Sequence, residues 1–480
     1  MIFNSIEFAI FLAIVFTIYW NIKNLTFRNA FLLISSYVFY GWWDARFLLL
    51  IIFSSFCDFY IGKKLHNNSS DKKRKLYLYL SIGINLGILG IFKYFNFFME
   101  SFSDFANYFG VHVSPFTLKI ILPVGISFYT FQTLSYTIDL YRKKIPVENN
   151  LLNFFAFVSF FPQLVAGPIE RGRLLLPQFK TLKTFDPKNI VLGLRQILWG
   201  LFQKVVIADQ CAPLVNDIFN HYNEYSSLLL ISGAFLFAFQ IYGDFAGYSN
   251  IAIGTARLLG FNLMRNFAYP YFSRDMAEFW RRWHISLSTW FRDYLYIPLG
   301  GSRGGKLMVI RNVFIIFIVS GFWHGANWTY IVWGLLNAIY FIPLTLLNRN
   351  RNNIEIVAKD KKLPSLKELA SILSTFLLTS FAWIYFRSES LADANSYIYN
   401  LFSMNLKLQD FSLGIIVDTV LAFFFIGILI CIEWIWRRES YPFQNVQGNT
   451  FVRWFYYVAI GTLILTYVNS NQSTFIYFQF

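Results

Sequence analysis

The sequence predicts an all-α protein that crosses a membrane many times. Of its 480 residues, 56% are hydrophobic, 21% are aromatic and only 14% are charged, whereas roughly a quarter of a soluble domain is charged. Apolar runs long enough to cross about 30 Å of hydrocarbon at 1.5 Å per helical residue recur along the whole chain. No stretch between them is long enough for a soluble domain, so we expect one membrane-embedded domain over residues 1–480.

The apolar runs define the expected elements in order. Residues 1–20 lack the basic leading region and the cleavage site of a secretory signal, so they predict a first membrane helix. Further runs predict membrane helices, some of them broken or re-entrant. They lie near 29–41, 46–62, 76–98, 118–140, 189–208, 227–243, 309–324, 328–347, 368–386, 412–436 and 453–468. Together they predict about 11–13 membrane helices.

Lysine and arginine orient these helices, because loops rich in them stay on the cytoplasmic side. The basic loops are 63–75, 142–144, 171–183, 265–311, 349–367 and 437–438. The poorly basic connections 99–116, 209–226 and 387–411 are then expected outside, together with both termini. Residues 151–168 have basic flanks on both sides, so they are expected to dip into the membrane and return. Since membrane topology accounts for the net charge of +15, we expect no nucleic-acid partner.

Polar residues at membrane depth mark the candidate site, because each costs a few kcal/mol there without a partner or a function. Residues 274–305 are too polar to span and too aromatic for a solvated loop. Their apolar stripe at near-helical spacing predicts an amphipathic helix at the cytoplasmic interface. The stripe consists of Phe279, Trp283, Leu287 and Trp290, with a start at Ser273 or Asp275 and an end at Pro298 and the GGSRGG turn. A second region, residues 320–328, places His324 between two apolar runs, and Asp244 lies at the end of another span.

Seven segments in the same order resemble the membrane-bound O-acyltransferase family, most closely the bacterial branch that contains the alginate O-acetylation membrane protein. They are FNSIEF at the start, LPVGISFYTFQTLSYTIDLYR at 122–142, FFPQLVAGPIER at 160–171, QIYGDFAGYSNIAIGTARLLGF at 240–261, EFWRRWHISLSTWFRDYLYIPLGG at 278–301, SGFWHGANWTYIVWG at 320–334, and FIYFQF at the end. The core motifs fall within 118–347. The resemblance implies a ring of membrane helices around a thinned centre, with a passage between a cytoplasmic acyl donor and an acceptor near the other face.

The same resemblance implies that His324 is the catalytic histidine and His284 a second functional histidine. Acyl transfer from a thioester to a hydroxyl requires a base and donors that stabilise an oxyanion. Neutral imidazole suits the first role, and Asn327 with the backbone N–H groups around Gly325 suits the second. Three arginines beside His284 are candidates to pair with phosphates of the donor. They are Arg281, Arg282 and Arg292, and Asp244 is a further candidate supporting residue.

Each candidate also has a purely structural interpretation. A lone histidine among apolar residues is more often hydrogen-bonded between helices than catalytic, and arginines more often mark the cytoplasmic boundary than a ligand site. Asp244 is equally interpreted as a helix-packing residue. Cys57, Cys211 and Cys431 have no metal-ligand spacing, and we expect no metal and no bound cofactor.

The sequence therefore predicts an O-acyltransferase of the bacterial cytoplasmic (inner) membrane. Acetyl-CoA or another acyl thioester is the expected donor substrate. The expected acceptors are an extracytoplasmic polysaccharide or a partner SGNH-type acetyltransferase. Two alternatives remain at this point: D-alanyl transfer to teichoic acid, and a non-enzymatic polysaccharide transporter or flippase. A transporter predicts two related halves with ionisable residues spread through the midplane, whereas here the unusual polar residues concentrate in 244–328.

Overall fold

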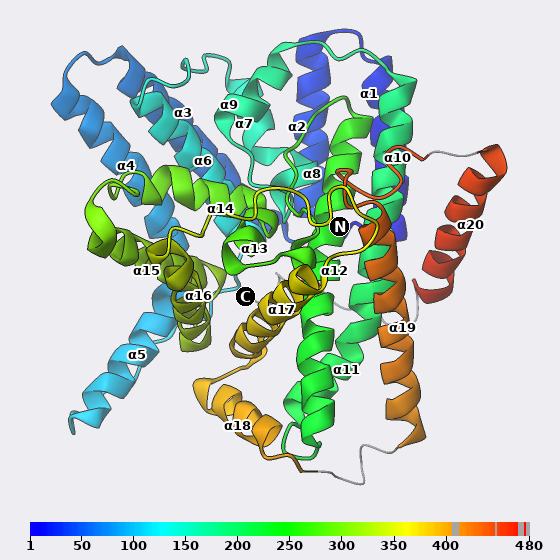
Figure 1. The fold of residues 1–480 in the computed structure, drawn as a ribbon. Helices are drawn as coiled ribbons and strands as arrows, with labels where there is room; N and C mark the ends of the chain where they lie inside the picture. The colour runs from blue at the N-terminus through cyan, green and yellow to red at the C-terminus, as the bar shows by residue number, and fades with distance from the viewer. Residues whose placement is uncertain (406–411, 447–448, 469–474, 477–480) are drawn as a thin grey trace. The chain divides into compact units, whose positions relative to one another are not determined.

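The computed structural model describes residues 1–405, 412–446, 449–468 and 475–476, and over these residues it contains helices and no strands (Figure 1). Eight helical segments among them are long and apolar enough to cross a membrane. They are Ala45–Asn67, Asp71–Tyr108, Pro187–Asn220, Ser227–Leu258, Gly305–His324, Trp328–Leu346, Leu366–Arg387 and Leu413–Ile435. Each matches a span predicted from the sequence, which confirms an all-α, multi-pass membrane protein.

The four other predicted spans correspond to shorter helices. They are α1 (Ile6–Asn21), α2 (Leu25–Gly41), α6 (Ile126–Tyr141) and α20 (Thr450–Tyr467), of 16, 17, 16 and 18 residues. The span expected at 118–140 is helical only from Ile126, because Pro123 and the left-handed Gly125 (φ 76°) precede the helix. Residues 477–480 of the closing motif, and 406–411 of the connection expected outside, lie beyond the described residues.

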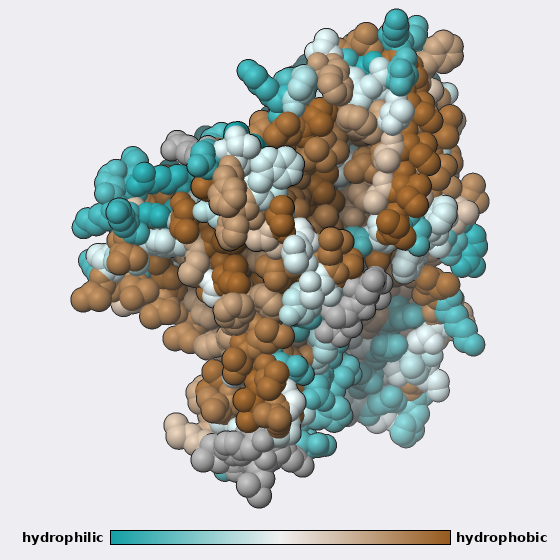
Figure 2. All heavy atoms as spheres, turned by 90° about the vertical axis from the view of Figure 1, so that its right-hand side faces the viewer, coloured by the Kyte–Doolittle hydropathy of each residue, from teal (hydrophilic) through white to brown (hydrophobic). Residues whose placement is uncertain are grey.

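Large apolar side chains are exposed along the spans. On α19 (Leu413–Ile435), for example, Val420 is 63% exposed and Phe424 60%. Figure 2 shows broad areas of hydrophobic side chains on the face that it presents. A soluble protein rarely exposes apolar patches of this extent. Contact with lipid accounts for them.

The chain divides into two compact units. Unit 1 contains residues 1–190 and 255–264, and unit 2 contains residues 191–254 and 265–480. Besides α1, α2 and α6, unit 1 is built of η1 (Ala45–Phe47), α3 (Leu48–Asn67), α4 (Asp71–Leu89), η2 (Gly90–Tyr94), α5 (Phe95–Tyr108), α7 (Leu151–Ser159), α8 (Phe161–Leu164), α9 (Gly172–Leu175) and η3 (Leu176–Lys180).

A buried carboxylate joins three helices of unit 1. Asp58 on α3 accepts hydrogen bonds from Ser81 Oγ at 2.5 Å and Asn85 Nδ2 at 2.8 Å, both on α4. On α6, Thr133 Oγ1 donates to Asn85 Oδ1 at 3.0 Å. Polar bonds of this kind fix which helices associate in an apolar environment, where the hydrophobic effect does not.

The segment 151–168 forms two short helices, α7 and α8, that meet at Phe160. Asn150 caps the first helix by accepting a hydrogen bond from the backbone N–H of Asn153. Residues 153–154 and 156–168 are buried within unit 1. A broken helix buried in protein is the form that non-spanning backbone takes at membrane depth. Re-entry of this segment from the cytoplasmic side stays a prediction.

Unit 2 holds both candidate histidines. Its elements are α10 (Pro187–Leu201, from residue 191), η4 (Phe202–Ala208), α11 (Asp209–Asn220), α12 (Ser227–Leu258, to residue 254), η5 (Pro270–Phe272), α13 (Met276–Arg282), α14 (Ile285–Phe291), η6 (Arg292–Tyr296), α15 (Gly305–His324), α16 (Trp328–Leu346), α17 (Leu366–Arg387), α18 (Leu391–Phe402), α19 and α20.

The amphipathic helix expected within 274–305 is interrupted, which corrects the prediction. Asp275 begins α13 as its N-cap, accepting from the backbone N–H of Glu278 at 2.7 Å. The helix ends at Arg282, however, and α14 starts only after His284. The apolar stripe therefore belongs to two short helices, and His284 occupies the junction between them.

Candidate functional site

His324 is placed by a tight helical hairpin, α15 and α16. A methyl group at Gly321 would overlap the backbone oxygen of Tyr330, and one at Gly334 would overlap that of Phe317. These glycines therefore let the two helix backbones approach closely, as small residues do in membrane helix pairs. Gly325 ends α15 in an extended conformation, which leaves His324 as the last residue of that helix, at the turn.

Aromatic rings surround the His324 imidazole. Its centroid lies 4.9 Å from that of Trp323, 5.2 Å from that of Trp333 and 5.2 Å from that of Phe386, all at steep angles. Trp333 in turn stacks on Trp383 of α17 at 5.5 Å. The residue as a whole is 5% exposed. The imidazole is therefore enclosed by side chains of α15, α16 and α17.

His284 is held by one asparagine. Its Nδ1 lies 3.0 Å from Asn266 Oδ1. The same Oδ1 accepts from Ser286 Oγ at 2.9 Å, and the Asn266 amide nitrogen donates to Ser249 Oγ at 3.0 Å. An amide oxygen accepts only, so the proton of neutral His284 sits on Nδ1 and the ring lone pair on Nε2. Asn266 thereby sets the tautomer that leaves Nε2 as the basic atom.

The backbone of His284 is strained. Its φ and ψ are 42° and 55°, in the left-handed region, where residues other than glycine cost of order 1 kcal/mol. The backbone N–H of Ile285 donates to Asn266 O at 2.8 Å and helps hold this conformation. Strained residues that surrounding contacts hold in place concentrate at functional sites.

The two histidines share a neighbour. The Trp323 ring lies 6.0 Å from the ring of His284 and 4.9 Å from that of His324, centroid to centroid. His284 is also 4.6 Å from Phe245 of α12, at 89°. Residues 40 positions apart in the sequence are thus brought to one aromatic cluster in unit 2.

Burial lowers the pKa of His284 from 6.5 to about 3, so the residue is neutral in the folded protein at neutral pH. The contribution of neutral His284 to the free energy of unfolding is fully present above pH 6.5. It is lost as the pH falls towards 3, because over this range the histidine is protonated in the unfolded chain but not in the folded protein. We expect the thermal unfolding midpoint of the wild type to fall more steeply between about pH 7 and about pH 5 than that of His284→Gln. Replacing the exposed His66 by Gln is the matched control and should leave the wild-type slope. Equal slopes for wild type and His284→Gln would contradict this account.

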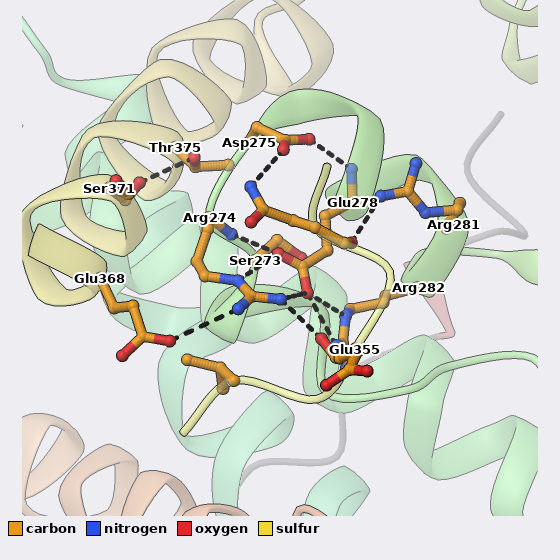
Figure 3. A network of polar contacts seen from close by, with 12 residues as sticks. Ser273, Arg274, Asp275, Glu278, Arg281, Arg282, Glu355, Glu368, Ser371 and Thr375 are labelled. Carbon is orange, nitrogen blue, oxygen red and sulfur yellow. Dashed lines mark hydrogen bonds and ion pairs between the residues drawn. The ribbon is translucent and has the colours of Figure 1, made fainter. Parts of the chain in front are cut away.

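Figure 3 shows where the arginines next to His284 direct their guanidinium groups. Arg281 donates to the backbone oxygens of Asn350 and Asn353, both at 2.7 Å. Arg282 donates to Glu278 Oε1 at 2.8 Å and to Ala268 O at 3.1 Å. These bonds tie α13 to its neighbours. They leave these two guanidinium groups less available to a donor phosphate than the sequence suggests.

Arg292 differs from its two companions. Its side chain is 58% exposed and pairs with Asp293 at 2.8 Å on η6. A surface pair of this kind contributes at most about 1 kcal/mol. A phosphate can therefore displace or join it at little cost. Arg292 thus pairs with a neighbouring carboxylate, whereas Arg281 donates to backbone oxygens.

The two supporting candidates each have defined partners. Asn327 caps α16, accepting from the backbone N–H of Thr329 at 3.0 Å and donating to Glu389 O at 2.7 Å. Asp244 on α12 pairs with Lys204 Nζ at 2.8 Å, and the same ammonium lies 2.7 Å from Asp209. These contacts match the helix-packing interpretation of Asp244 and give Asn327 a capping role.

Sequence reasoning missed several residues that shape the site. Asn266 lies 18 positions before His284, and no short motif links the two. Trp333 and Trp383 come from different helices, so their stacking depends on tertiary packing. Composition gave a general signal, since 14 tryptophans and 57 phenylalanines provide many rings for such contacts.

Comparison with known proteins gives consistent results. The model of the membrane-bound O-acyltransferase family matches residues 142–388. A probable alginate O-acetylase of Pseudomonas putida is 36% identical over 100% of both chains. One from Pseudomonas aeruginosa is 40% identical over 82% of this chain and 73% of its own. A peptidoglycan O-acetyltransferase of Helicobacter pylori is 31% identical over 95% of this chain and 92% of its own.

Proposed function

Since the chain belongs to the membrane-bound O-acyltransferase family, we propose that it transfers an acetyl group from a cytoplasmic thioester towards hydroxyl groups outside the cell, with His324 as general base. That it is a membrane O-acyltransferase follows from the family itself. The observation that carries the finer proposal is the placement of His324 and His284 around Trp323. It gives two imidazole side chains in one buried aromatic cluster.

In the proposed reaction, His324 takes the proton of the acceptor hydroxyl as its oxygen attacks the thioester carbonyl carbon. The new C–O bond forms, the carbonyl oxygen becomes an oxyanion, and the C–S bond then breaks. The proton passes from His324 to the departing thiolate, so the imidazole ends neutral. This role needs a neutral imidazole when the hydroxyl arrives, because only the neutral ring has a lone pair that can accept the proton.

His284 is proposed as a positioning or second proton-handling group. Its fixed tautomer and low pKa make Nε2 an acceptor throughout the working pH range. The oxyanion would be met by backbone N–H groups around Gly325, since the Asn327 amide nitrogen donates to Glu389 O. Arg292, with its exposed guanidinium, is proposed to receive a phosphate of the donor, either coenzyme A or a phosphopantetheine arm.

The acceptor is proposed to be an extracytoplasmic polysaccharide or an SGNH-type transferase that serves it, at the cytoplasmic membrane of a bacterium. Relatives aligned over nearly the whole chain carry two different acceptor names, alginate and peptidoglycan. A common part of the reaction, delivery of acetyl to the outer face, is what such proteins can share. Because these alignments cover both units, we also propose that residues 1–480 act as one domain.

The test is to delete the gene in its host and analyse the ester-linked groups that mild base releases from purified surface polysaccharide. We expect acetate to disappear and to return with the wild-type gene on a plasmid. Unchanged acetate would refute acetyl transfer. Loss of D-alanine instead of acetate would establish the teichoic-acid reaction and refute the acetyl assignment.

A further inference from the structure

A cavity of about 190 Å³ lies in unit 2 where the end of α11, the end of α17 and the start of α18 meet. Its lining consists of Phe219, Asn220, Tyr222, Arg387, Ser388, Glu389, Asp393 and Tyr397. At about 30 Å³ per water molecule, this space holds about six waters. A cavity of that size admits one small ring and excludes a folded segment of chain.

The cavity belongs to the face that charge places outside the cell. Its residues come from 219–222 and 387–397, which fall within the poorly basic connections 209–226 and 387–411. Lysine- and arginine-poor connections lie opposite the cytoplasm. An acceptor that arrives from outside therefore meets this cavity on the correct side.

Two stacked rings form the apolar part of the lining. Phe219 and Tyr397 lie 4.5 Å apart at 17°, and Tyr397 is fully buried, donating from its hydroxyl to Leu230 O at 2.6 Å. The two ring faces are turned toward each other, and the Arg387 guanidinium lies over Phe219 at 5.4 Å, so the rings close the inner wall of the cavity and the polar groups face its contents.

Planar polar groups complete the lining. Asp393 accepts from Tyr222 Oη at 3.1 Å and from Ser390 Oγ at 2.6 Å, which fixes its carboxylate and leaves part of its accepting capacity for a ligand. Arg387 donates to Asn216 Oδ1 at 2.9 Å and lies over the Phe219 ring at 5.4 Å. A carboxylate presents two acceptors, a guanidinium presents paired donors, and an amide presents one acceptor and one donor group. Each of these pairs suits two neighbouring hydroxyls on a sugar ring.

The charges select among sugars. Glu389 and Asp393 contribute two carboxylates, and Arg387 one guanidinium, so the lining carries more negative than positive charge. A hexuronate brings a further carboxylate into this field and is repelled. A neutral sugar has no such penalty.

The cavity is also linked to His324. Phe386, whose ring lies 5.2 Å from that of His324, directly precedes Arg387 and Ser388 of the lining. On the other side, Asn327, three residues after His324, donates to the backbone oxygen of Glu389 at 2.7 Å. The same short turns thus position both the imidazole and the cavity.

From this geometry we infer that the cavity formed by α11, α17 and α18 binds one neutral saccharide residue of the acceptor on the outer face. The inference rests on the proposed acetyl transfer and names its acceptor class. The relatives named for alginate act on a polymer of uronates, so the inference separates this chain from them in substrate.

The experiment measures binding to the purified full-length protein in lipid nanodiscs, without acyl donor, by saturation-transfer NMR. The probes are cellotriose, which is neutral, and the similarly linked tri-mannuronate, which is anionic. We expect saturable cellotriose binding and weaker tri-mannuronate binding. Glu389→Ala and Asn220→Ala should each weaken cellotriose binding by about tenfold, through the loss of one hydrogen bond to the sugar.

Asn395→Ala is the matched control for Asn220→Ala, because Asn395 is also an exposed asparagine but bonds to Tyr385 Oη outside the lining. It should bind cellotriose as the wild type does. His324→Gln should bind equally well, so that a failure of catalysis is distinguishable from a failure of binding. Absence of cellotriose binding, tighter binding of tri-mannuronate, or full binding by both lining variants would each overturn the inference. Loss of acetyl transfer in the lining variants without any saccharide binding would assign the cavity to a protein partner instead.

Discussion

His324→Gln is expected to lower acetyl transfer by about 10² to 10⁴, the usual loss when a general base is removed. Glutamine is close in volume to histidine and keeps the aromatic packing around residue 324, so the protein should still reach the membrane. His324→Ala should lose as much activity, since neither side chain accepts the hydroxyl proton. Acetate on the surface polysaccharide, normalised to membrane abundance, is the measurement.

Two other histidines provide the comparison. His112→Gln, in the predicted outer connection 99–116, should retain wild-type acetylation. His284→Gln should lose less than His324→Gln if His284 only orients the reactants, and equally much if it shares the proton path. Wild-type acetylation by His324→Gln at normal abundance would remove His324 from the reaction.

Glu278→Leu is expected to lower the free energy of unfolding by about 3–5 kcal/mol, the typical effect of removing one partner from a buried ion pair. The carboxylate is 1% exposed and pairs with Arg274 at 3.0 Å and Arg282 at 2.8 Å (Figure 3). Its loss removes the carboxylate that two guanidinium groups share, each of them 12% exposed, and leaves Arg274 with the longer contact to Glu368 at 3.4 Å. Unfolding of the purified protein in detergent, followed by tryptophan fluorescence, measures the change.

Glu355→Leu is the matched control, since the Glu355 side chain is 71% exposed and pairs with Lys359 at 3.5 Å. We expect it to change stability by less than about 1 kcal/mol. If Glu278→Leu fails to accumulate, Glu278→Gln, which keeps the volume and one accepting oxygen, should be recovered at intermediate stability. Stability equal to that of the Glu355 variant would show that the buried network contributes nothing.

The membrane spans were predictable because length and apolarity alone define them. In the part of the chain that the structure describes, the eight helices that satisfy both criteria coincide with predicted runs. The start of α6 was not predictable in this way, since Pro123 and Gly125 delay the helix within an apolar run. The break at His284 was also missed. The apolar stripe keeps helical spacing across it, and the left-handed turn depends on Asn266, which is distant in sequence.

Within the site, sequence identified the histidines but not their surroundings. His324 stood out as a polar residue between apolar runs, and the resemblance singled it out. Its contacts with Trp333 and Phe386 arise only when α15, α16 and α17 pack together. The arginines show the opposite case. The position of the arginines beside His284 suggested anion binding. In the structure, however, Arg281 donates to backbone oxygens of the segment after α16, a contact that no local sequence pattern indicates.

The central claim is that acetyl passes from the cytoplasmic side to the outer side through His324. Inside-out membrane vesicles from the host test it directly, with radiolabelled acetyl-CoA added to the exposed cytoplasmic face and Cys labels at Asn67 and Asn223 verifying that these sites lie on opposite sides. The account predicts that label accumulates in material that an added esterase cannot reach until detergent opens the vesicles, and that His324→Gln vesicles accumulate none. Equal labelling in His324→Gln vesicles, or label that the esterase removes from sealed vesicles, would contradict it.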